Sequence, residues 1–130
     1  MSIVFTNGCF DIVHRGHIEL LRFCKSLGDT VIVGLNSDKS IKRIKGSERP
    51  INSEEDRKFL LESLKFVDNV IIFSEDTPYE LIKSIKPDII VKGGDYSPEE
   101  VVGGDICKVV IFKNVIGYST TRAIQNIANR

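Results

Sequence analysis

The only two histidines of the chain, His14 and His17, stand three residues apart with Gly16 between them. They follow a short apolar run and precede an amphipathic segment, which places them in a strand-to-helix loop. The start of a helix presents unpaired backbone N–H groups and the positive end of the helix dipole, both of which favour phosphate. Imidazoles there can donate to phosphoryl oxygens, and Gly16 permits close approach to the backbone. This predicts a phosphate site, with incidental surface or capping histidines as the alternative. Two histidines without a well-spaced third ligand do not favour zinc.

Two further polar groups stand at the ends of predicted elements. Lys92, Gly93, Asp95 and Tyr96 belong to a Lys-Gly-Gly-Asp-Tyr run that directly follows an apolar segment. Its glycines allow close backbone approach, Asp95 can accept from an amine or hydroxyl, and Tyr96 offers a ring face. A plain glycine turn is the alternative interpretation. Residues 119–121, Ser-Thr-Thr, precede the last amphipathic segment, where they are predicted to cap a helix and form an array of donors.

Short apolar runs alternate with amphipathic segments along the chain. The runs are rich in β-branched residues and predict strands over 3–6, 31–35, 70–73, 89–91 and 109–112. Helices are predicted over about 16–27, from Ser53 with apolar positions at Phe59, Leu60, Leu64 and Val67, from Thr77 to before Pro87, and after residue 121. This order predicts one α/β domain, Rossmann-like, with a mainly parallel five-stranded sheet and helices on both faces. Ligands of such sheets bind beyond the carboxyl ends of the strands, where the polar groups above lie.

Composition restricts the class of protein further. The 130 residues are 42% hydrophobic, which suits one domain with a packed core. Eighteen basic and eighteen acidic residues cancel, whereas a nucleic-acid-coating protein usually carries a basic excess. No apolar run is long enough to span a membrane, and no secretory signal is expected at the start. Three cysteines without a CxxC pair favour reduced thiols and a cytoplasmic location.

Two motifs resemble those of a known family. The pattern Gly-x-Phe-Asp-x-x-His-x-Gly-His over residues 8–17 resembles the HxGH element of the cytidylyltransferase-like nucleotidyltransferases, and Gly-Tyr-Ser-Thr-Thr over 117–121 resembles their GxSTT element. The resemblance covers about residues 4–127. It implies a nucleotidyltransferase domain over 1–130 that binds a nucleoside triphosphate, transfers the nucleotidyl group to a phosphorylated or acidic acceptor and releases pyrophosphate. Such transfer needs positioning and charge neutralisation more than a covalent nucleophile.

The resemblance also assigns roles to residues. His14 and His17 contact the triphosphate in the transition state, and Lys45 neutralises incoming charge from a mobile basic loop over 36–51. Mg²⁺ is expected on the triphosphate, with no metal site on the protein. The nucleotide-binding set carried over is Thr6, Asn7, Gly8, Cys9, Phe10, Asp11, Gly16, Arg57, Lys92, Gly93, Asp95, Tyr96, Ser119, Thr120 and Thr121. Within it, Lys92, Gly93, Asp95 and Tyr96 are expected on the base and ribose side.

One branch of the family fits best. The Lys-Gly-Gly-Asp-Tyr run, with Asn-Gly-Cys-Phe-Asp at 7–11, resembles the D-glycero-β-D-manno-heptose 1-phosphate adenylyltransferases, which implies ATP and a sugar phosphate as substrates, as in lipopolysaccharide precursor synthesis. The alternatives are a glycerol-3-phosphate cytidylyltransferase and a catalytically silent nucleotide-binding module. Ile116 stands where an acidic residue is common, and the 101–108 segment looks short, so the acceptor is the least determined part. A free-standing enzyme that forms a homodimer is expected by analogy.

Overall fold

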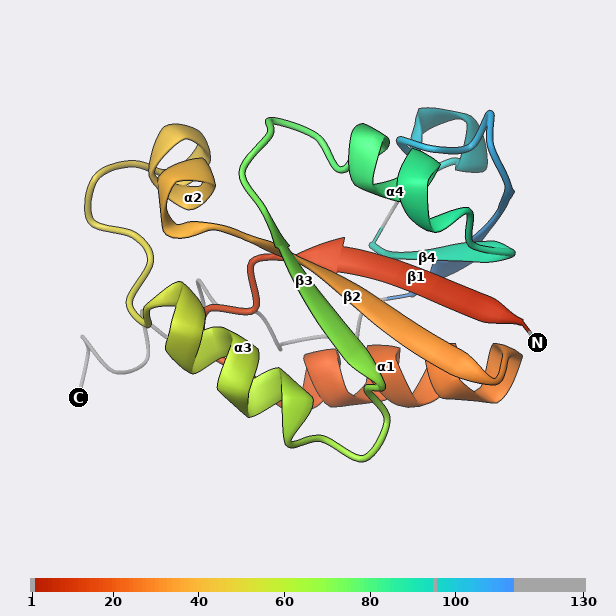
Figure 1. The fold of residues 1–130 in the computed structure, drawn as a ribbon, viewed down its shortest axis with the longest axis horizontal. Helices are drawn as coiled ribbons and strands as arrows, with labels where there is room; N and C mark the ends of the chain where they lie inside the picture. Colours follow the sequence, from red (N-terminus) through yellow and green to blue (C-terminus); the bar gives the residue numbers. More distant parts are fainter. Residues whose placement is uncertain (1, 95, 114–130) are drawn as a thin grey trace.

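Five parallel strands form one sheet in the computed structural model, which describes residues 2–94 and 96–113 (Figure 1). The strands are β1 (Ile3–Gly8), β2 (Thr30–Asn36), β3 (Asn69–Phe73), β4 (Ile89–Gly93) and β5 (Lys108–Phe112). Their order across the sheet is β3-β2-β1-β4-β5, and each neighbouring pair is parallel. The predicted sheet is confirmed, and it is wholly parallel among the described residues.

Helices cover both faces of this sheet. They are α1 (Arg15–Leu27), α2 (Asp38–Lys45), α3 (Glu54–Glu62) and α4 (Tyr79–Ile85), with a short 3₁₀ turn η1 (Pro98–Glu100) before β5. Figure 1 shows α1 and α3 on one face and α4 with the η1 segment on the other. Two apolar clusters fill the layers: Val4, Leu21 and Leu61 belong to the α1 side, and Phe5, Ile82 and Ile90 to the α4 side. We call these the α1 face and the α4 face.

The chain changes direction across the sheet at β1. It runs outward from β1 to β2 and β3, and then returns to form β4 on the other side of β1. Because β1 thus lies between β2 and β4, the loops that follow β1 and β4 run in opposite directions. A crevice opens between these loops, at the carboxyl ends of the two strands. This is the topological switch point at which open α/β sheets bind their ligands.

Two predictions about the segments after β2 are wrong. Residues 38–45, expected as a mobile loop, form helix α2, which Ser37 caps by accepting from the Ser40 N–H. Three of its four basic residues, Lys42, Arg43 and Lys45, fall in the last turn, where they suit the helix dipole, and Gly46 ends the helix at φ 104°. Of the four apolar positions expected in this segment, Val67 is buried and Leu64 packs against the core, whereas Phe59 and Leu60 are 69% and 45% exposed because α3 turns its other side to the core.

The last helix predicted from the sequence lies outside the described residues. In the part that the structure describes, no helix combines the length and the apolar character that a bilayer crossing requires.

Candidate active site

The two histidines are fixed by the first turn of α1. His14 is the N-cap residue, and its Nδ1 accepts from the Gly16 N–H at 3.0 Å. His17 reaches back, and its Nδ1 accepts from the His14 N–H at 3.2 Å. The two rings stack with centroids 3.9 Å apart. Since both Nδ1 atoms accept backbone hydrogen bonds, each neutral imidazole carries its proton on Nε2.

Both imidazoles are neutral at physiological pH. Burial lowers the pKa of His17 to about 3, and the charges of His14 and Lys45 act in the same direction. Burial also lowers the pKa of His14 below its ordinary value. A neutral imidazole with an Nε2–H can hold an anion without first being protonated, and of the two it is His17 that lines the hollow described next.

A hollow of about 140 Å³ opens beside His17, above the carboxyl ends of β1 and β4. Phe10 forms part of its wall, with its ring centroid 4.9 Å from that of His17. A Cβ on Gly8 would lie 3.1 Å from the Phe10 ring, so a side chain at position 8 would require the ring to move by a few tenths of an ångström. The lining residues are Asn7, Gly8, Cys9, Phe10, His17, Leu20, Lys92 and Gly93. Leu20, from the second turn of α1, was not anticipated from the sequence.

Lys45 lies near this hollow although it is 28 residues beyond His17 in the chain. It is the last residue of α2, and its charge lowers the pKa of both His17 and Cys9. The net effect on Cys9 is nevertheless a raised pKa, because burial outweighs the nearby cations. Arg43, two residues earlier in α2, is turned away toward Asp76 and the Ser74 carbonyl.

Three residues of the predicted nucleotide-binding set have side chains that are buried and hydrogen-bonded within the protein, and their contact with a nucleotide stays a prediction. Thr6 is 1% exposed and donates to the Val91 carbonyl at 2.8 Å, which joins β1 to β4. Asp11 is 1% exposed and accepts from the backbone N–H groups of Ile51 and Asn52. These side chains join β1 to β4 and the loop after β1 to residues 51 and 52.

The third of these residues, Arg57, is completely buried in α3. Its guanidinium donates to the carbonyls of Cys9 at 2.9 Å, Asn36 at 2.7 Å and Asn52 at 3.0 Å, and to the Asp38 carboxylate at 2.7 Å. It thereby ties the loop after β1, the end of β2 and the start of α2 to one point. Arg57 is a positioning residue for both the histidine loop and the helix that carries Lys45.

Arg49 is a half-buried cation that the sequence did not single out. Its Nε lies 3.2 Å from the Asp11 carboxylate, and its side chain is 15% exposed. Its Nη2 is buried without a hydrogen-bond partner among the described residues. Nothing in the local sequence distinguishes it from its exposed basic neighbours, so only the fold identifies it.

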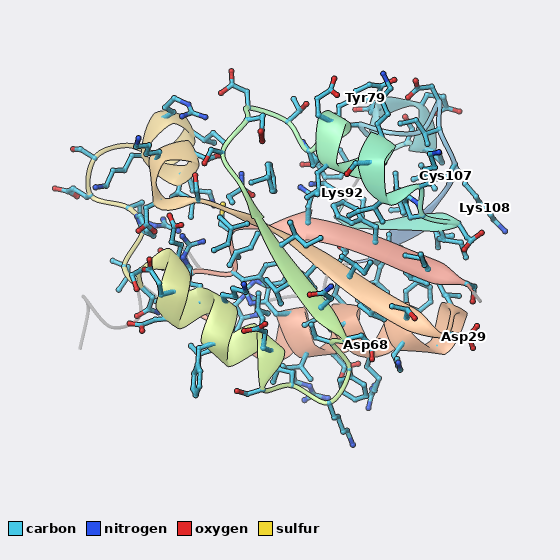
Figure 2. The ribbon with its side chains drawn as sticks, in the orientation of Figure 1. Asp29, Asp68, Tyr79, Lys92, Cys107 and Lys108 are labelled. Atoms are coloured by element: carbon cyan, nitrogen blue, oxygen red, sulfur yellow. The ribbon has the colours of Figure 1, made fainter. Side chains whose placement is uncertain are left out.

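The residues after β4 separate into two groups. Gly93 lines the hollow beside His17, whereas Tyr96 lines a second hollow of about 180 Å³. Lys92 lines both, and its Nζ lies 5.3 Å from the centroid of the Tyr96 ring. Burial lowers the pKa of Lys92, and the neighbouring Cys9 partly opposes this. Figure 2 shows Lys92 on the α4 side of the sheet.

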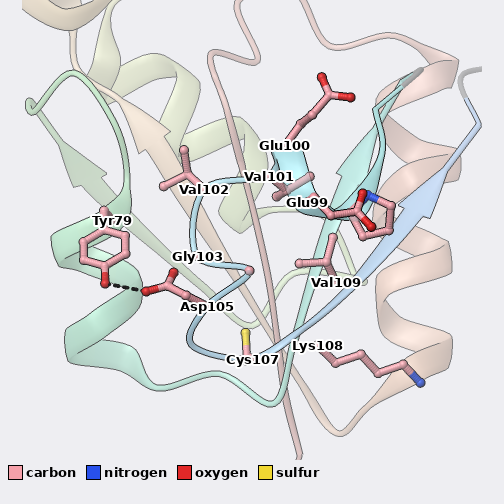
Figure 3. A pocket seen from close by; sticks show the side chains of 12 residues that line it. Tyr79, Glu99, Glu100, Val101, Val102, Gly103, Asp105, Cys107, Lys108 and Val109 are labelled. Carbon is pink, nitrogen blue, oxygen red and sulfur yellow. Dashed lines mark hydrogen bonds between the residues drawn. The ribbon is translucent and has the colours of Figure 1, made fainter.

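A larger hollow of about 590 Å³ lies farther along the same side, between the start of α4 and β5 (Figure 3). Tyr79 donates to Asp105 at 2.8 Å across its rim. Acidic residues and a thiol line it, and neither histidine does. It adjoins the second hollow through Glu100, Val101 and Val102, which line both.

Several predicted residues lie outside the described residues: Asp95, Ser119, Thr120 and Thr121. Their roles stay predictions. Among the described residues, no group of three His, Cys, Asp or Glu side chains is arranged to hold a metal ion.

Fold and site together define a Rossmann-like domain with two stacked imidazoles at the switch point of its sheet. Residues 5–126 match the Cytidylyltransferase-like family, so the chain belongs to that family, and the resemblance drawn from its motifs is confirmed.

Comparisons with relatives and solved structures agree. The chain is 60% identical over 126 residues to the bifunctional protein HldE of a Nitratiruptor species, and 56% identical over 129 residues to that of Helicobacter pylori. These matches cover 96–97% of this chain and 27% of each relative, so the chain spans about a quarter of their length. A crystal structure of the lipopolysaccharide core biosynthesis protein from Thermoplasma volcanium is 33% identical, with a TM-score of 0.73 over 88% of this chain and 97% of that one.

Proposed function

We propose that this domain, residues 1–130, is an adenylyltransferase that converts ATP and D-glycero-β-D-manno-heptose 1-phosphate to ADP-heptose and pyrophosphate. The observation that carries the proposal is the pair of neutral imidazoles fixed at the start of α1, at the switch point of the sheet. The high identity to HldE proteins and the likeness to a lipopolysaccharide core biosynthesis protein support the choice of substrates.

The reaction needs no covalent intermediate. A phosphate oxygen of the sugar phosphate attacks the α-phosphorus of ATP, and the bond from that phosphorus to the bridging oxygen of the β-phosphate breaks. Charge moves onto the departing pyrophosphate, where the Nε2–H of His17 donates to it. No general base is required, because the attacking phosphate is already an anion at neutral pH. Lys45 offsets the charge that the second phosphate brings.

The remaining assignments follow the family pattern. Ser119, Thr120 and Thr121 are proposed to hold the β and γ phosphates. The substrate is proposed to be the Mg²⁺ complex of ATP, with the ion carried by phosphate oxygens; the carboxylate of the histidine loop, Asp11, is already engaged by backbone N–H groups. We also propose a cytoplasmic location, which suits the three free thiols. The domain is expected to form a homodimer, and light scattering after gel filtration would test this.

The decisive experiment follows pyrophosphate release with ATP, CTP or GTP, each offered with heptose 1-phosphate or glycerol 3-phosphate. We expect release with ATP and heptose 1-phosphate. His17→Asn retains an acceptor for the His14 N–H but lacks the Nε2 donor, and we expect it to lower turnover roughly 100- to 1000-fold. Release only with CTP and glycerol 3-phosphate would refute the substrates, and unchanged turnover in the variant would refute the role of His17.

A further inference from the structure

Phe10, in the loop between β1 and α1, has an unusual backbone conformation. Its φ is 48°, in the left-handed region that a bulky residue rarely adopts because its Cβ crowds the backbone there. Its side chain is nevertheless only 4% exposed and belongs to the apolar cluster of the α1 face. Such a costly conformation persists only where surrounding contacts impose it, and it is found most often at functional sites.

Two anchors, one on each side of Phe10, hold the loop in this conformation. Before it, the Cys9 carbonyl accepts from the buried guanidinium of Arg57 at 2.9 Å. After it, the Asp11 carboxylate accepts from the backbone N–H groups of residues 51 and 52, and the Asp11 carbonyl accepts from the side-chain amide of the second at 2.7 Å. Both anchors come from α3 or the residues just before it, so tertiary contacts fix the backbone at Phe10.

The conformation places the Phe10 ring against His17. The two ring centroids lie 4.9 Å apart, with an angle of 53° between the ring planes. His17 also stacks on His14, with centroids 3.9 Å apart. The His17 imidazole therefore packs against two aromatic rings, and this packing restricts its rotation.

The same packing protects the hydrogen bond that orients His17. Its Nδ1 accepts from the His14 N–H, and a protonated imidazole, which carries hydrogen on both nitrogens, would lose this bond. Burial is the main cause of the lowered pKa of His17, and the Phe10 ring contributes to that burial. The titratable groups that act on His17 or line its hollow are His14, Lys45, Cys9 and Lys92. The ring thus keeps water from an imidazole whose orientation depends on its being neutral.

We propose that Phe10 is a positioning residue for the adenylyl transfer: its ring, held by the two loop anchors, keeps His17 in the orientation in which Nε2 donates to the departing pyrophosphate. This inference rests on the proposed function. A donor fixed before the reaction stabilises the developing charge without having to reorganise. Without the ring, His17 would gain rotational freedom and contact with water.

The first test needs no substrate. Phe10→Ala removes the ring, and Phe23→Ala is the matched control, because Phe23 lies on the same helix as His17 and its ring meets that of Phe112 at the same centroid distance of 4.9 Å. In an NMR titration, the pKa of His17 should rise from about 3 to roughly 5 or above in Phe10→Ala and stay unchanged in the control. Phe10→Leu, which keeps apolar bulk, should give a smaller rise, and it carries the test if the alanine variant does not fold.

The second test is kinetic. We expect Phe10→Ala to lower kcat roughly 10- to 100-fold at neutral pH, with the KM for heptose 1-phosphate changed by less than about twofold. The ratio of variant to wild-type kcat should fall about another twofold when the pH is lowered to about 5, since a pKa near 5 protonates about half of His17 there. Ionisation of the substrate phosphates is common to both proteins and cancels in this ratio.

The outcomes distinguish this inference from the proposed function. An unchanged pKa of His17 in Phe10→Ala, or an equal loss of kcat in Phe23→Ala, would overturn the positioning role while leaving the adenylyltransferase activity standing. A wild type that releases no pyrophosphate from ATP with heptose 1-phosphate would remove the proposed function, and the positioning role with it.

Discussion

The buried imidazole of His17 makes a quantitative prediction about stability and pH. Its pKa is about 3 in the folded protein and 6.5 in an unfolded chain. As the pH falls below 6.5, His17 binds a proton in the unfolded chain but stays neutral in the folded protein. The folded state therefore loses stability until the pH reaches about 3. Between pH 7.5 and 5.0 this group alone should lower the free energy of unfolding by about 2 kcal/mol. This decrease in the free energy of unfolding depends little on the pKa of His17 in the folded protein, since the imidazole is almost fully neutral at pH 5 for any pKa near 3 or 4.

The measurement compares urea unfolding of the wild type and His17→Asn at the two pH values. Asparagine can still accept from the His14 N–H but does not titrate, so the variant should lose about 2 kcal/mol less than the wild type over this interval. Carboxylates whose pKa is lowered, such as Asp29 and Asp68, are common to both proteins and cancel. An NMR titration adds a direct check, because the chain has only two histidines. Equal losses in both proteins, or a His17 signal that titrates near 6.5, would refute the buried neutral imidazole.

Two further predictions concern the support of the site. Arg57→Met should destabilise the protein by about 3–5 kcal/mol in urea unfolding, because it removes four hydrogen bonds and leaves the Asp38 carboxylate without its partner. Arg57→Lys should not restore this stability, since a single ammonium group cannot reach all four acceptors. A Lys variant as stable as the wild type would contradict the positioning role of Arg57. On the same helix, Leu61→Ala should cost about 2–5 kcal/mol, whereas Phe59→Ser should change stability by less than about 0.5 kcal/mol. Equal losses of stability for these two variants in thermal denaturation would show that the buried side of α3 is assigned incorrectly.

Local sequence accounts for much of this protein. The β-branched runs predict all five strands, because a strand buried on both faces must be apolar throughout. The spacing of His14 and His17 predicts their place at the start of a helix, because a capping interaction joins residues only two or three positions apart. The local sequence also indicates α2, although a basic loop was predicted there. The helix has Ser37 as its N-cap, Asp38 in its first turn and basic residues in its last turn before Gly46.

The site itself depended on contacts between segments distant in the chain. Arg57 resembles an exposed helical cation in the sequence, and only the convergence of the β1 loop, β2 and α2 around it makes it a buried clamp. Phe59 has the composition of a core residue, yet the orientation of α3 exposes it. The separation of His17 from Tyr96 by Asn7 and Lys92 likewise follows from strand order and pleat, since β1 and β4 become neighbours only in the folded sheet. Short-range patterns fix elements and their caps, whereas the packing of those elements decides which polar groups are buried and which face a ligand.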